Sequence, residues 1–250
     1  MTQKDEGSPP QKPERIAKVM ARAGLCSRRE AERWIEEGRV TLNGVVLETP
    51  AVTVTTMDEI NVDGKVLPQK TSTKLWAFHK PRGVVTTHYD PDGRETLFDI
   101  LPRNLLSHFP DHVISIGRLD LMSEGIILLT NDGEFARKLE HPSSNIPRTY
   151  HVRIYGDLDP HELDKLSTGI SVDNVDYGPI QWRFGPQTGQ NQWIEMTLYE
   201  GKNREIRKIV DHLGGRVNRL LRVSYGPFKL GDLDIAEGRE IKKEDFQHLL

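Results

Sequence analysis

Apolar residues recur at the spacing of one helix face directly after a polar stretch at the start of the chain. The first predicted helix begins near Glu14 and ends at Gly24, since glycine readily adopts the left-handed conformation that follows a helix. Ser27 and Glu30 have the capping-box spacing and predict the start of a second helix, which Gly38 closes. The apolar face of the first helix consists of Ile16, Val19, Met20 and Ala23, and that of the second of Ala31, Trp34 and Ile35.

Alternation replaces the helical spacing after this second helix. Two short apolar runs within residues 40–47 flank Asn43-Gly44, a dipeptide typical of the type I′ turn of a β-hairpin. Further strand is predicted over residues 52–66, with an interruption at Asp63-Gly64. A small helix-and-hairpin domain is therefore expected near the N-terminus.

The rest of the chain is longer and less regular. Its many short β-like runs are interrupted by a few helical patterns, and no period repeats, which favours an α+β fold over a strict βαβ repeat. Strands are predicted at residues 75–78, 84–87, 113–116, 125–130, 150–155 and 193–198, and helices at 133–140, 160–168 and 204–213. The expected organisation is a disordered tail at 1–13, a small domain at 14–68, a linker at 69–74 and a larger domain at 75–250.

Composition narrows the class of protein. The chain has 250 residues, a net charge of −3 and 36% hydrophobic residues, which indicates a soluble protein with ample core. Cys26 is the single cysteine, so an internal disulfide and a cysteine-rich zinc site are excluded. No run is apolar enough for a membrane span or a signal peptide, so a cytoplasmic protein without a membrane partner is expected. No motif argues for an oligomer, and a monomer is the default.

A carboxylate stands out between two apolar runs. Gly117-Arg118-Leu119-Asp120 follows one predicted buried strand and precedes another. A loop between two buried strands is held by the scaffold, which is where catalytic groups tend to lie. Asp120 is therefore the first candidate for chemistry, and Tyr150 offers an aromatic hydroxyl at the start of a later strand.

Positive charge is concentrated farther along the chain. Residues 202–222 contain seven cations and two acids, a local excess of 7 − 2 = +5 in a chain that is net acidic. Such a segment suits phosphate contacts, which give affinity without sequence readout. On the predicted helix there, Arg207 lies at the flank of the apolar face, where it can reach a neighbouring carboxylate, while Lys208 points outward.

Other chemistries have weaker support. The chain has neither a phosphate-binding loop nor a dinucleotide fingerprint, and no ligand set for a metal, so no cofactor is expected. Asp120 and Glu124 could form the acid–base pair of a glycoside hydrolase, but their spacing does not define a carboxyl separation. A catalytically silent RNA-binding protein is the other alternative.

The small domain resembles the S4 RNA-binding domain over its whole length. The resemblance rests on the order helix, Gly-x-Cys-Ser-Arg-Arg-Glu-Ala, helix, and then Gly-Arg-Val-Thr-Leu-Asn-Gly. From charge alone, the arginines of this domain are about equally consistent with a solvated helix face and with an RNA-binding surface. The resemblance favours the RNA-binding surface. It implies RNA contacts at Arg15, Arg28, Arg29 and Arg33.

The larger domain resembles the pseudouridine synthases of the RsuA/RluB family, and the match extends over most of the chain. Gly117-Arg118-Leu119-Asp120 looks like the catalytic motif of that family, and the segment 201–207 looks like its C-terminal basic motif. Segments 78–83, 128–133 and 219–226 also fit, in the same order behind an S4 domain. The resemblance implies a synthase domain with a mixed, largely antiparallel sheet flanked by helices.

The resemblance also implies roles for individual residues. Asp120 would be the catalytic aspartate, Tyr150 would stack on a flipped uracil, and Arg207 would pair with Asp120. Asp120 would break the glycosidic bond by attacking the sugar or base, or by removing the 2′ proton; these routes stay open. Arg118, Lys202, Arg204 and Lys208 would contact RNA. The Asn203-Arg204-Glu205-Ile206-Arg207 motif is closer to members that modify large-subunit ribosomal RNA than to the small-subunit type, which remains the alternative.

Overall fold

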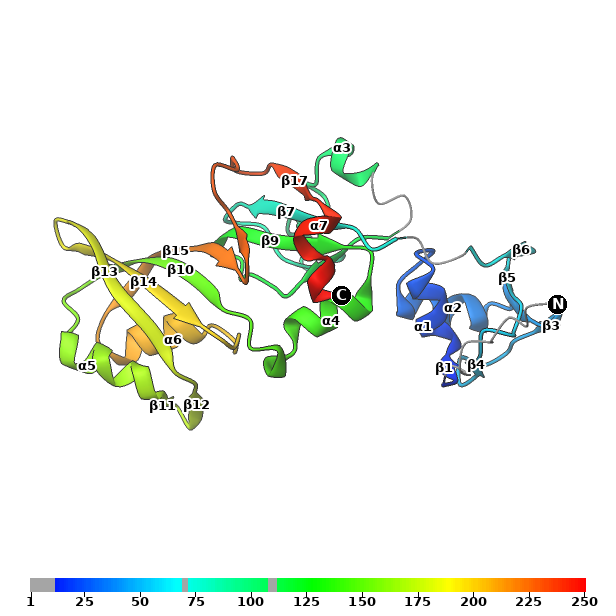
Figure 1. Ribbon diagram of the computed structural model, residues 1–250, viewed down its shortest axis with the longest axis horizontal. Coiled ribbons are helices and arrows are strands. Elements are labelled where there is room, and N and C mark those ends of the chain that lie inside the picture. Colours follow the sequence, from blue (N-terminus) through cyan, green and yellow to red (C-terminus); the bar gives the residue numbers. More distant parts are fainter. Residues whose placement is uncertain (1–11, 69–71, 108–111) are drawn as a thin grey trace, which may run out of the picture. The chain divides into compact units, whose positions relative to one another are not determined.

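The computed structural model describes residues 12–68, 72–107 and 112–250 of the chain. They form two compact units that meet in the sequence between Thr73 and Lys74 (Figure 1). Residues 1–11 of the expected tail and 69–71 of the expected linker lie outside the described residues. None of the described helices is both long and apolar enough to cross a membrane.

The first unit contains two helices, α1 (Ile16–Arg22) and α2 (Arg28–Glu36), of which α2 has a side-chain cap. The Ser27 hydroxyl accepts a hydrogen bond from the Glu30 backbone at 3.2 Å, and the Glu30 carboxylate accepts one from the Ser27 backbone at 2.9 Å. The predicted capping box is therefore confirmed.

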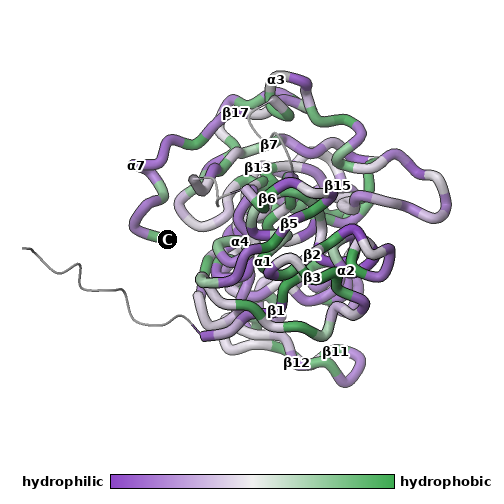
Figure 2. The backbone as a smooth tube through the Cα atoms, turned by 90° about the vertical axis from the view of Figure 1, so that its right-hand side faces the viewer, coloured by the Kyte–Doolittle hydropathy of each residue, from purple (hydrophilic) through white to green (hydrophobic). Residues whose placement is uncertain are grey.

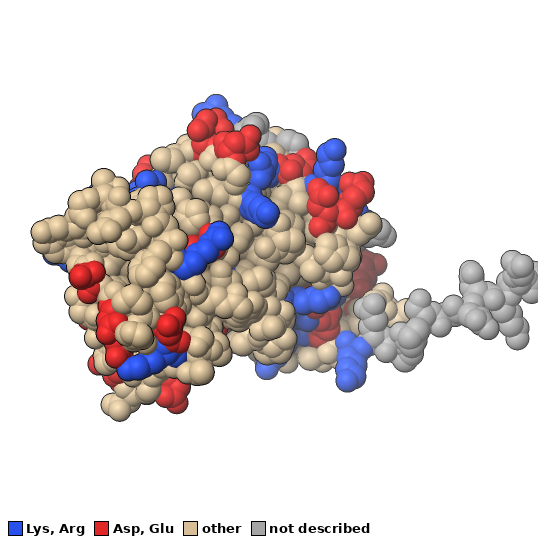
Figure 3. Space-filling view, turned by 60° about the vertical axis from the view of Figure 1, so that its left-hand side comes forward, with Lys and Arg blue, Asp and Glu red and all other residues tan. Residues whose placement is uncertain are grey.

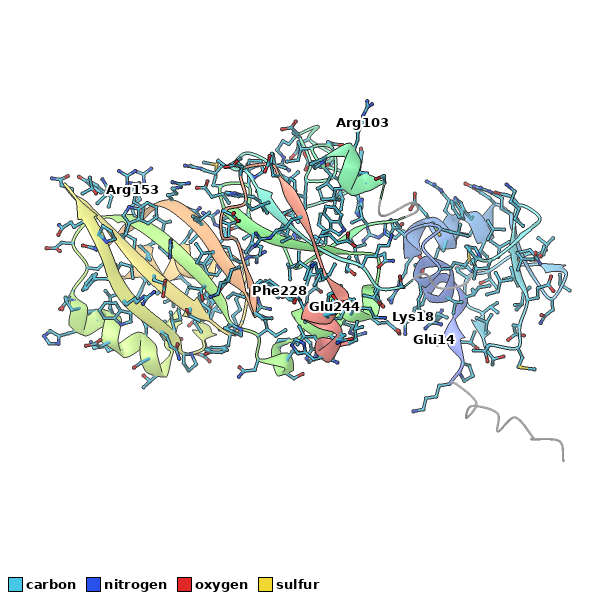
Figure 4. All side chains as sticks on the ribbon, turned by 45° about the horizontal axis from the view of Figure 1, so that its top comes forward. Glu14, Lys18, Arg103, Arg153, Phe228 and Glu244 are labelled. Carbon is cyan, nitrogen blue, oxygen red and sulfur yellow. The ribbon has the colours of Figure 1, made fainter. Side chains whose placement is uncertain are left out.

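The start of α1 lies two residues later than expected. Glu14 and Arg15 form the short strand β1 (Glu14–Arg15), which pairs with β4 (Thr53–Val54) before the helix begins. The Glu14 carboxylate then forms an ion pair with Lys18 on the first turns of α1, as their neighbouring positions in Figure 4 show.

Four short strands complete this unit: β2 (Val40–Leu42), β3 (Val45–Val46), β5 (Ile60–Val62) and β6 (Lys65–Val66). Their order in the sheet is β3-β2-β5-β6. Asn43 and Gly44 have φ values of 51° and 82°, as a type I′ turn requires, so the predicted hairpin is confirmed. The sheet and helices share one apolar core in which Ile16, Met20 and Ile35 are fully buried.

The second unit is built on one sheet of nine strands. Their bounds are β7 (Leu75–Lys80), β8 (Ile114–Ile116), β9 (Glu124–Thr130), β10 (Arg148–Tyr155), β13 (Ile180–Thr188), β14 (Asn191–Leu198), β15 (Arg216–Tyr225), β16 (Phe228–Lys229) and β17 (Gly238–Ile241). The order is β13-β14-β10-β15-β9-β7-β17, with β16 beside β15 and β8 beside β9. Within this sheet β15 and β9 pair in parallel and the other described pairs are antiparallel. The expected mixed, largely antiparallel sheet is confirmed.

Helices lie against both halves of this sheet (Figure 1), and their apolar side chains share its two cores. The helices α5 (Pro160–Lys165) and α6 (Glu205–His212) share a core with β10 and β14, and Ile209 and Val210 are buried there as the helical spacing predicted. The helices α4 (Gly133–Glu140) and α7 (Lys243–Phe246) cover β7 and β9, where the rings of Phe135 and Phe246 lie 5.6 Å apart.

The predicted strand at residues 84–87 is wrong. Among the described residues, a single bridge joins Val85 to Thr96, and the Thr86 hydroxyl donates to the Leu119 carbonyl of another loop. The pattern also missed β13, β15 and α7: β15 carries three arginines in ten residues, and α7 is short and mainly hydrophilic (Figure 2). The remaining elements are α3 (Arg103–Leu106), β11 (Ile170–Val172), β12 (Val175–Tyr177) and the 3₁₀ turns Pro142–Ser144, Leu166–Thr168 and Gln247–Leu249.

Candidate active site

A cleft of about 590 Å³ opens on the second unit and gathers several of the predicted residues. Asp120 lines it from the loop between β8 and β9, and Tyr150 lines it from β10. Arg118, Lys202 and Arg204 line the same cleft. A carboxylate, an aromatic ring and three basic side chains, from segments far apart in the sequence, therefore share one cavity.

Hydrogen bonds to its backbone hold the loop that carries Asp120. The Thr86 hydroxyl donates to the Leu119 carbonyl at 2.8 Å and accepts from the Leu119 N–H at 3.3 Å. The Gly83 N–H donates to the Leu121 carbonyl at 2.8 Å. The backbone on both sides of Asp120 is thus held by hydrogen bonds, which positions the loop before any substrate binds.

Lys80 lies fully buried beneath the same loop. Its ammonium donates to the carbonyls of Pro81, Asp120 and Ser123 at 2.9, 3.3 and 3.0 Å. Burial lowers the pKa of Lys80 to about 8; the Asp120 carboxylate opposes this shift and the charge of Arg222 adds to it. Lys80 therefore braces the backbone of the loop with a buried charge that lies close to the candidate catalytic group.

Tyr150 is half-buried and supported from both sides by the sheet. Its cross-strand partners are Met196 on β14 and Arg222 on β15, and its ring packs against the apolar core under β10. A ring fixed in this way offers a flat surface inside the cleft, which is what stacking on a flipped base requires.

Arg207 reaches the Asp120 loop through the backbone. It lies half-buried on α6 and donates to the Met122 carbonyl at 2.9 Å and to the Val217 carbonyl at 3.4 Å. Burial and the charge of Arg204 lower the pKa of Arg207, whereas the Asp120 carboxylate favours its charged form. Among the described residues Arg207 and Asp120 form no direct ion pair, so their expected pairing stays a prediction.

The rim of the cleft at residues 200–205 is tied together by acidic and basic groups. The Lys202 ammonium donates to the Asp176 carbonyl at 2.7 Å and forms an ion pair with Glu200. Glu205 is buried and accepts a hydrogen bond from the Lys202 backbone at 3.0 Å. Burial raises the pKa of Glu205 to about 7, and the charge of Glu200 adds to this shift.

Other predicted RNA contacts lie outside the residues that line the cleft. Lys208 is half-buried on α6. Acidic and basic side chains are interspersed on the face shown in Figure 3, so no patch of one sign covers that face. The four arginines of the first unit that were predicted to contact RNA are all exposed: Arg15, Arg28, Arg29 and Arg33.

Glu124, the second carboxylate of the glycoside-hydrolase alternative, is already engaged. It is buried and accepts two hydrogen bonds from the Arg219 guanidinium, at 2.6 and 3.2 Å. Glu124 is also absent from the cleft lining, so that alternative loses its acid–base pair.

Comparison with known proteins decides the family. Residues 74–212 match the sequence profile of RNA pseudouridylate synthases, and residues 14–60 match that of the S4 domain. The chain belongs to the RNA pseudouridylate synthase family. Its combination of this domain with an N-terminal S4 domain is that of the RsuA/RluB type, as the sequence predicted, and it is an RNA pseudouridine synthase.

Individual relatives agree with the family. The synthase is 44% identical over 231 residues to an uncharacterized RNA pseudouridine synthase of Rickettsia bellii, covering 92% of this chain and 98% of the relative. It is 40% identical to the ribosomal large subunit pseudouridine synthase B of Yersinia pestis, covering 87% of this chain and 69% of the relative. A crystal structure of a pseudouridylate synthase shares the fold with a TM-score of 0.65 at 22% identity, over 94% of this chain and 99% of that one.

The structure adds residues of the synthase to which the sequence assigned no role. Lys80 lies in the segment 78–83, and Arg222 lies in the segment 219–226, both of which carried the family resemblance. Arg148 and Arg222 line the cleft although both are buried. A lysine or arginine in the sequence is expected at the surface, so no local signal separated these three from solvent-exposed cations.

Proposed function

We propose that the synthase isomerises a uridine of large-subunit ribosomal RNA to pseudouridine, with Asp120 as the catalytic group and Tyr150 as the stacking platform. The observation that carries this proposal is the presence of Asp120 and Tyr150 in one cleft of about 590 Å³, lined also by basic residues. The similarity to the large-subunit enzyme of Yersinia pestis supports the substrate class.

Isomerisation of a uridine requires a carboxylate such as that of Asp120 and an aromatic ring such as that of Tyr150. A uridine within folded RNA must leave its stack and enter the cleft, where the Tyr150 ring would replace the lost stacking. Asp120 would then promote cleavage of the N1–C1′ bond, and a new bond from C5 to C1′ would replace it. The C5 proton is lost and N1 is protonated, so the isomerisation is redox-neutral.

Basic residues would hold the RNA around the reacting uridine. Arg118, Lys202 and Arg204 line the cleft and would contact phosphates near its mouth. Arg15, Arg28, Arg29 and Arg33 would extend the RNA surface over the S4 domain, and Lys208 over α6. Arg207 would keep Asp120 ionised and would hold the loop through Met122.

Pseudouridine mapping of ribosomal RNA tests this function. Ribosomal RNA from cells lacking the synthase would be labelled with carbodiimide and compared after adding back wild type or Asp120→Ala. We expect one reverse-transcription stop in large-subunit RNA to vanish in the deletion and to return only with wild type. A stop restored by Asp120→Ala would contradict the catalytic assignment, and a lost stop in small-subunit RNA would contradict the substrate. If all stops persist, a silent RNA-binding protein becomes the better description.

A further inference from the structure

Two arginines beside Tyr150 are buried without a counter-ion. Arg148 is 7% exposed and Arg222 is 2% exposed. Arg148 Nη2 donates to the Tyr225 hydroxyl at 3.1 Å and to the Glu140 carbonyl at 3.4 Å, and Arg222 Nε donates to the Ile126 carbonyl at 2.7 Å. Within the described part of the chain, Arg148 Nη1 and Arg222 Nη2 are buried with no hydrogen-bond partner, and neither arginine forms an ion pair.

The strand register places both arginines next to Tyr150 in the sheet. Arg222 is the cross-strand partner of Tyr150, and Arg148 precedes Tyr150 by two residues on β10. All three side chains line the cleft. The guanidinium carbons of Arg148 and Arg222 lie 5.0 and 5.1 Å from the centre of the Tyr225 ring, which also lines the cleft.

Such an arrangement is costly unless a ligand completes it. A buried charge without a counter-ion is strongly unfavourable, and each buried N–H without an acceptor adds a further penalty. Arginines that only support a fold satisfy their donors with carboxylates or carbonyls. Here one buried terminal nitrogen of each guanidinium, with its two N–H groups, has no acceptor, and both arginines line the cleft.

We propose that Arg148 and Arg222 hold the carbonyl oxygens of the uracil stacked on Tyr150 and stabilise the negative charge that this base gains during the reaction. This inference rests on the proposed function. When the N1–C1′ bond breaks by attack on the sugar or by loss of the 2′ proton, the electron pair stays on uracil and spreads over N1, O2 and O4. Preorganised donors in a buried site favour that anion over neutral uracil until C5 bonds to C1′ and the C5 proton leaves.

Burial favours the base over a phosphate as the ligand. The exposed basic residues of the cleft, Arg118 and Arg204, are placed for the RNA backbone, which must stay near the mouth. The two buried arginines instead line the part of the cleft next to Tyr150, since Arg222 is opposite Tyr150 in the sheet and Arg148 is two residues before it on β10. The acceptors that reach this depth are therefore the uracil oxygens.

The test compares Arg148→Gln and Arg222→Lys with a matched control, Arg153→Gln. Arg153 also lies on β10 but is outside the cleft lining (Figure 4). With saturating ribosomal RNA, we expect the single-turnover rate constant of each site variant to fall about 10²–10³-fold, while the control stays near wild type. RNA affinity, measured by filter binding, should change less than about threefold, because phosphate contacts carry it.

A substrate with 5-fluorouridine at the target separates charge stabilisation from a structural role. Fluorine withdraws electrons and stabilises the uracil anion, so the leaving base needs less help from the arginines. At a pH where N3 of the fluorouracil keeps its proton, the rate loss for consumption of the target nucleoside should shrink on the order of tenfold. A misplaced Tyr150 or a disturbed fold would lower the rates for both substrates equally.

The outcomes are distinct. A rate loss that shrinks with 5-fluorouridine supports the inference. An equal loss of rate with both substrates, or no loss of rate in either variant, overturns it. If Arg222→Lys fails to fold, Arg148→Gln alone still distinguishes these outcomes. Failure of wild type to form pseudouridine in large-subunit RNA would instead overturn the proposed function.

Discussion

Arginines of the synthase occur in two contrasting environments, and each unit contains an example of one of them. In the S4 domain, Arg28, Arg29 and Arg33 lie on the surface of α2, and Arg33 makes only a loose contact with Glu37 at 3.6 Å. In the catalytic domain, Arg148 and Arg222 are buried within the sheet. The same side chain thus occurs in water in one unit and almost completely removed from it in the other.

The two environments differ in the free energy that is needed to keep the guanidinium group charged. An exposed arginine is stabilised by water and contributes little to stability, so it is free to neutralise phosphate with an affinity that salt screens. A buried arginine has lost that hydration, and its field acts through a medium of low polarisability. Surface arginines therefore suit binding, and buried ones suit stabilisation of charge at the reacting atoms.

The largest effect should come from Asp120→Asn. The substitution keeps the shape of the side chain but removes its charge, and we expect the single-turnover rate to fall by at least about 10³-fold. RNA affinity should stay within about twofold of wild type, since the S4 surface is untouched. A comparable loss of affinity would show that the two units do not divide binding and chemistry.

Lys80→Met should have the next largest effect. Methionine fills most of the same buried space but cannot donate to Pro81, Asp120 and Ser123. We expect a rate loss of about 10–100-fold at saturating RNA, because a loosened loop misplaces the carboxylate. Lys65→Met, at an exposed lysine of the S4 domain, is the control. An unchanged rate would show that the remaining loop contacts suffice.

Removal of surface charge from the S4 domain should affect binding alone. For the triple variant Arg28→Gln, Arg29→Gln, Arg33→Gln, we expect affinity to fall roughly tenfold at low salt and the slope of log K against log salt to flatten by about 1 or more. The rate at saturating RNA should be unchanged. The double variant Glu32→Gln, Glu36→Gln on the same helix should tighten binding, and an unaltered slope in the triple variant would place the RNA elsewhere.

The smallest expected effect is on the pH dependence of folding stability, to which Glu205 contributes. Folding raises its pKa from the ordinary 4.5 to about 7, so the folded chain keeps a proton that the unfolded chain releases. Stability from this group is complete below pH 4.5 and is lost as pH rises to about 7. Glu205→Gln should remove that decline and stabilise the protein by on the order of 1 kcal/mol at pH 8. Urea unfolding of both proteins at pH 5 and pH 8 measures it, and parallel pH curves would refute it.

Local patterns predicted much of the S4 domain and the position of the loop that carries Asp120. The capping box at Ser27, the hairpin at Asn43-Gly44 and the helix over 133–140 depend on neighbouring residues alone, and all three are confirmed. Strand β15 was not predicted because its three arginines interrupt the alternation of apolar and polar residues that is typical of a strand. Its pairing with β9 is also non-local in the sequence. Gly125 shows how close that pairing is, since a Cβ there would lie 2.2 Å from the Arg222 carbonyl oxygen.

Short motifs and their spacing are properties of the chain, so they identified the family, the order of the two domains and the candidacy of Asp120 and Tyr150. Which cations are buried depends instead on how the strands and helices pack. In the sequence, Lys80, Arg148 and Arg222 cannot be distinguished from a lysine or arginine at the surface. They are buried because strands that are far apart in the sequence pack around them. The tertiary structure likewise decided that Arg207 bonds the Met122 carbonyl. Burial is a collective property of packed elements, and no window of sequence contains it.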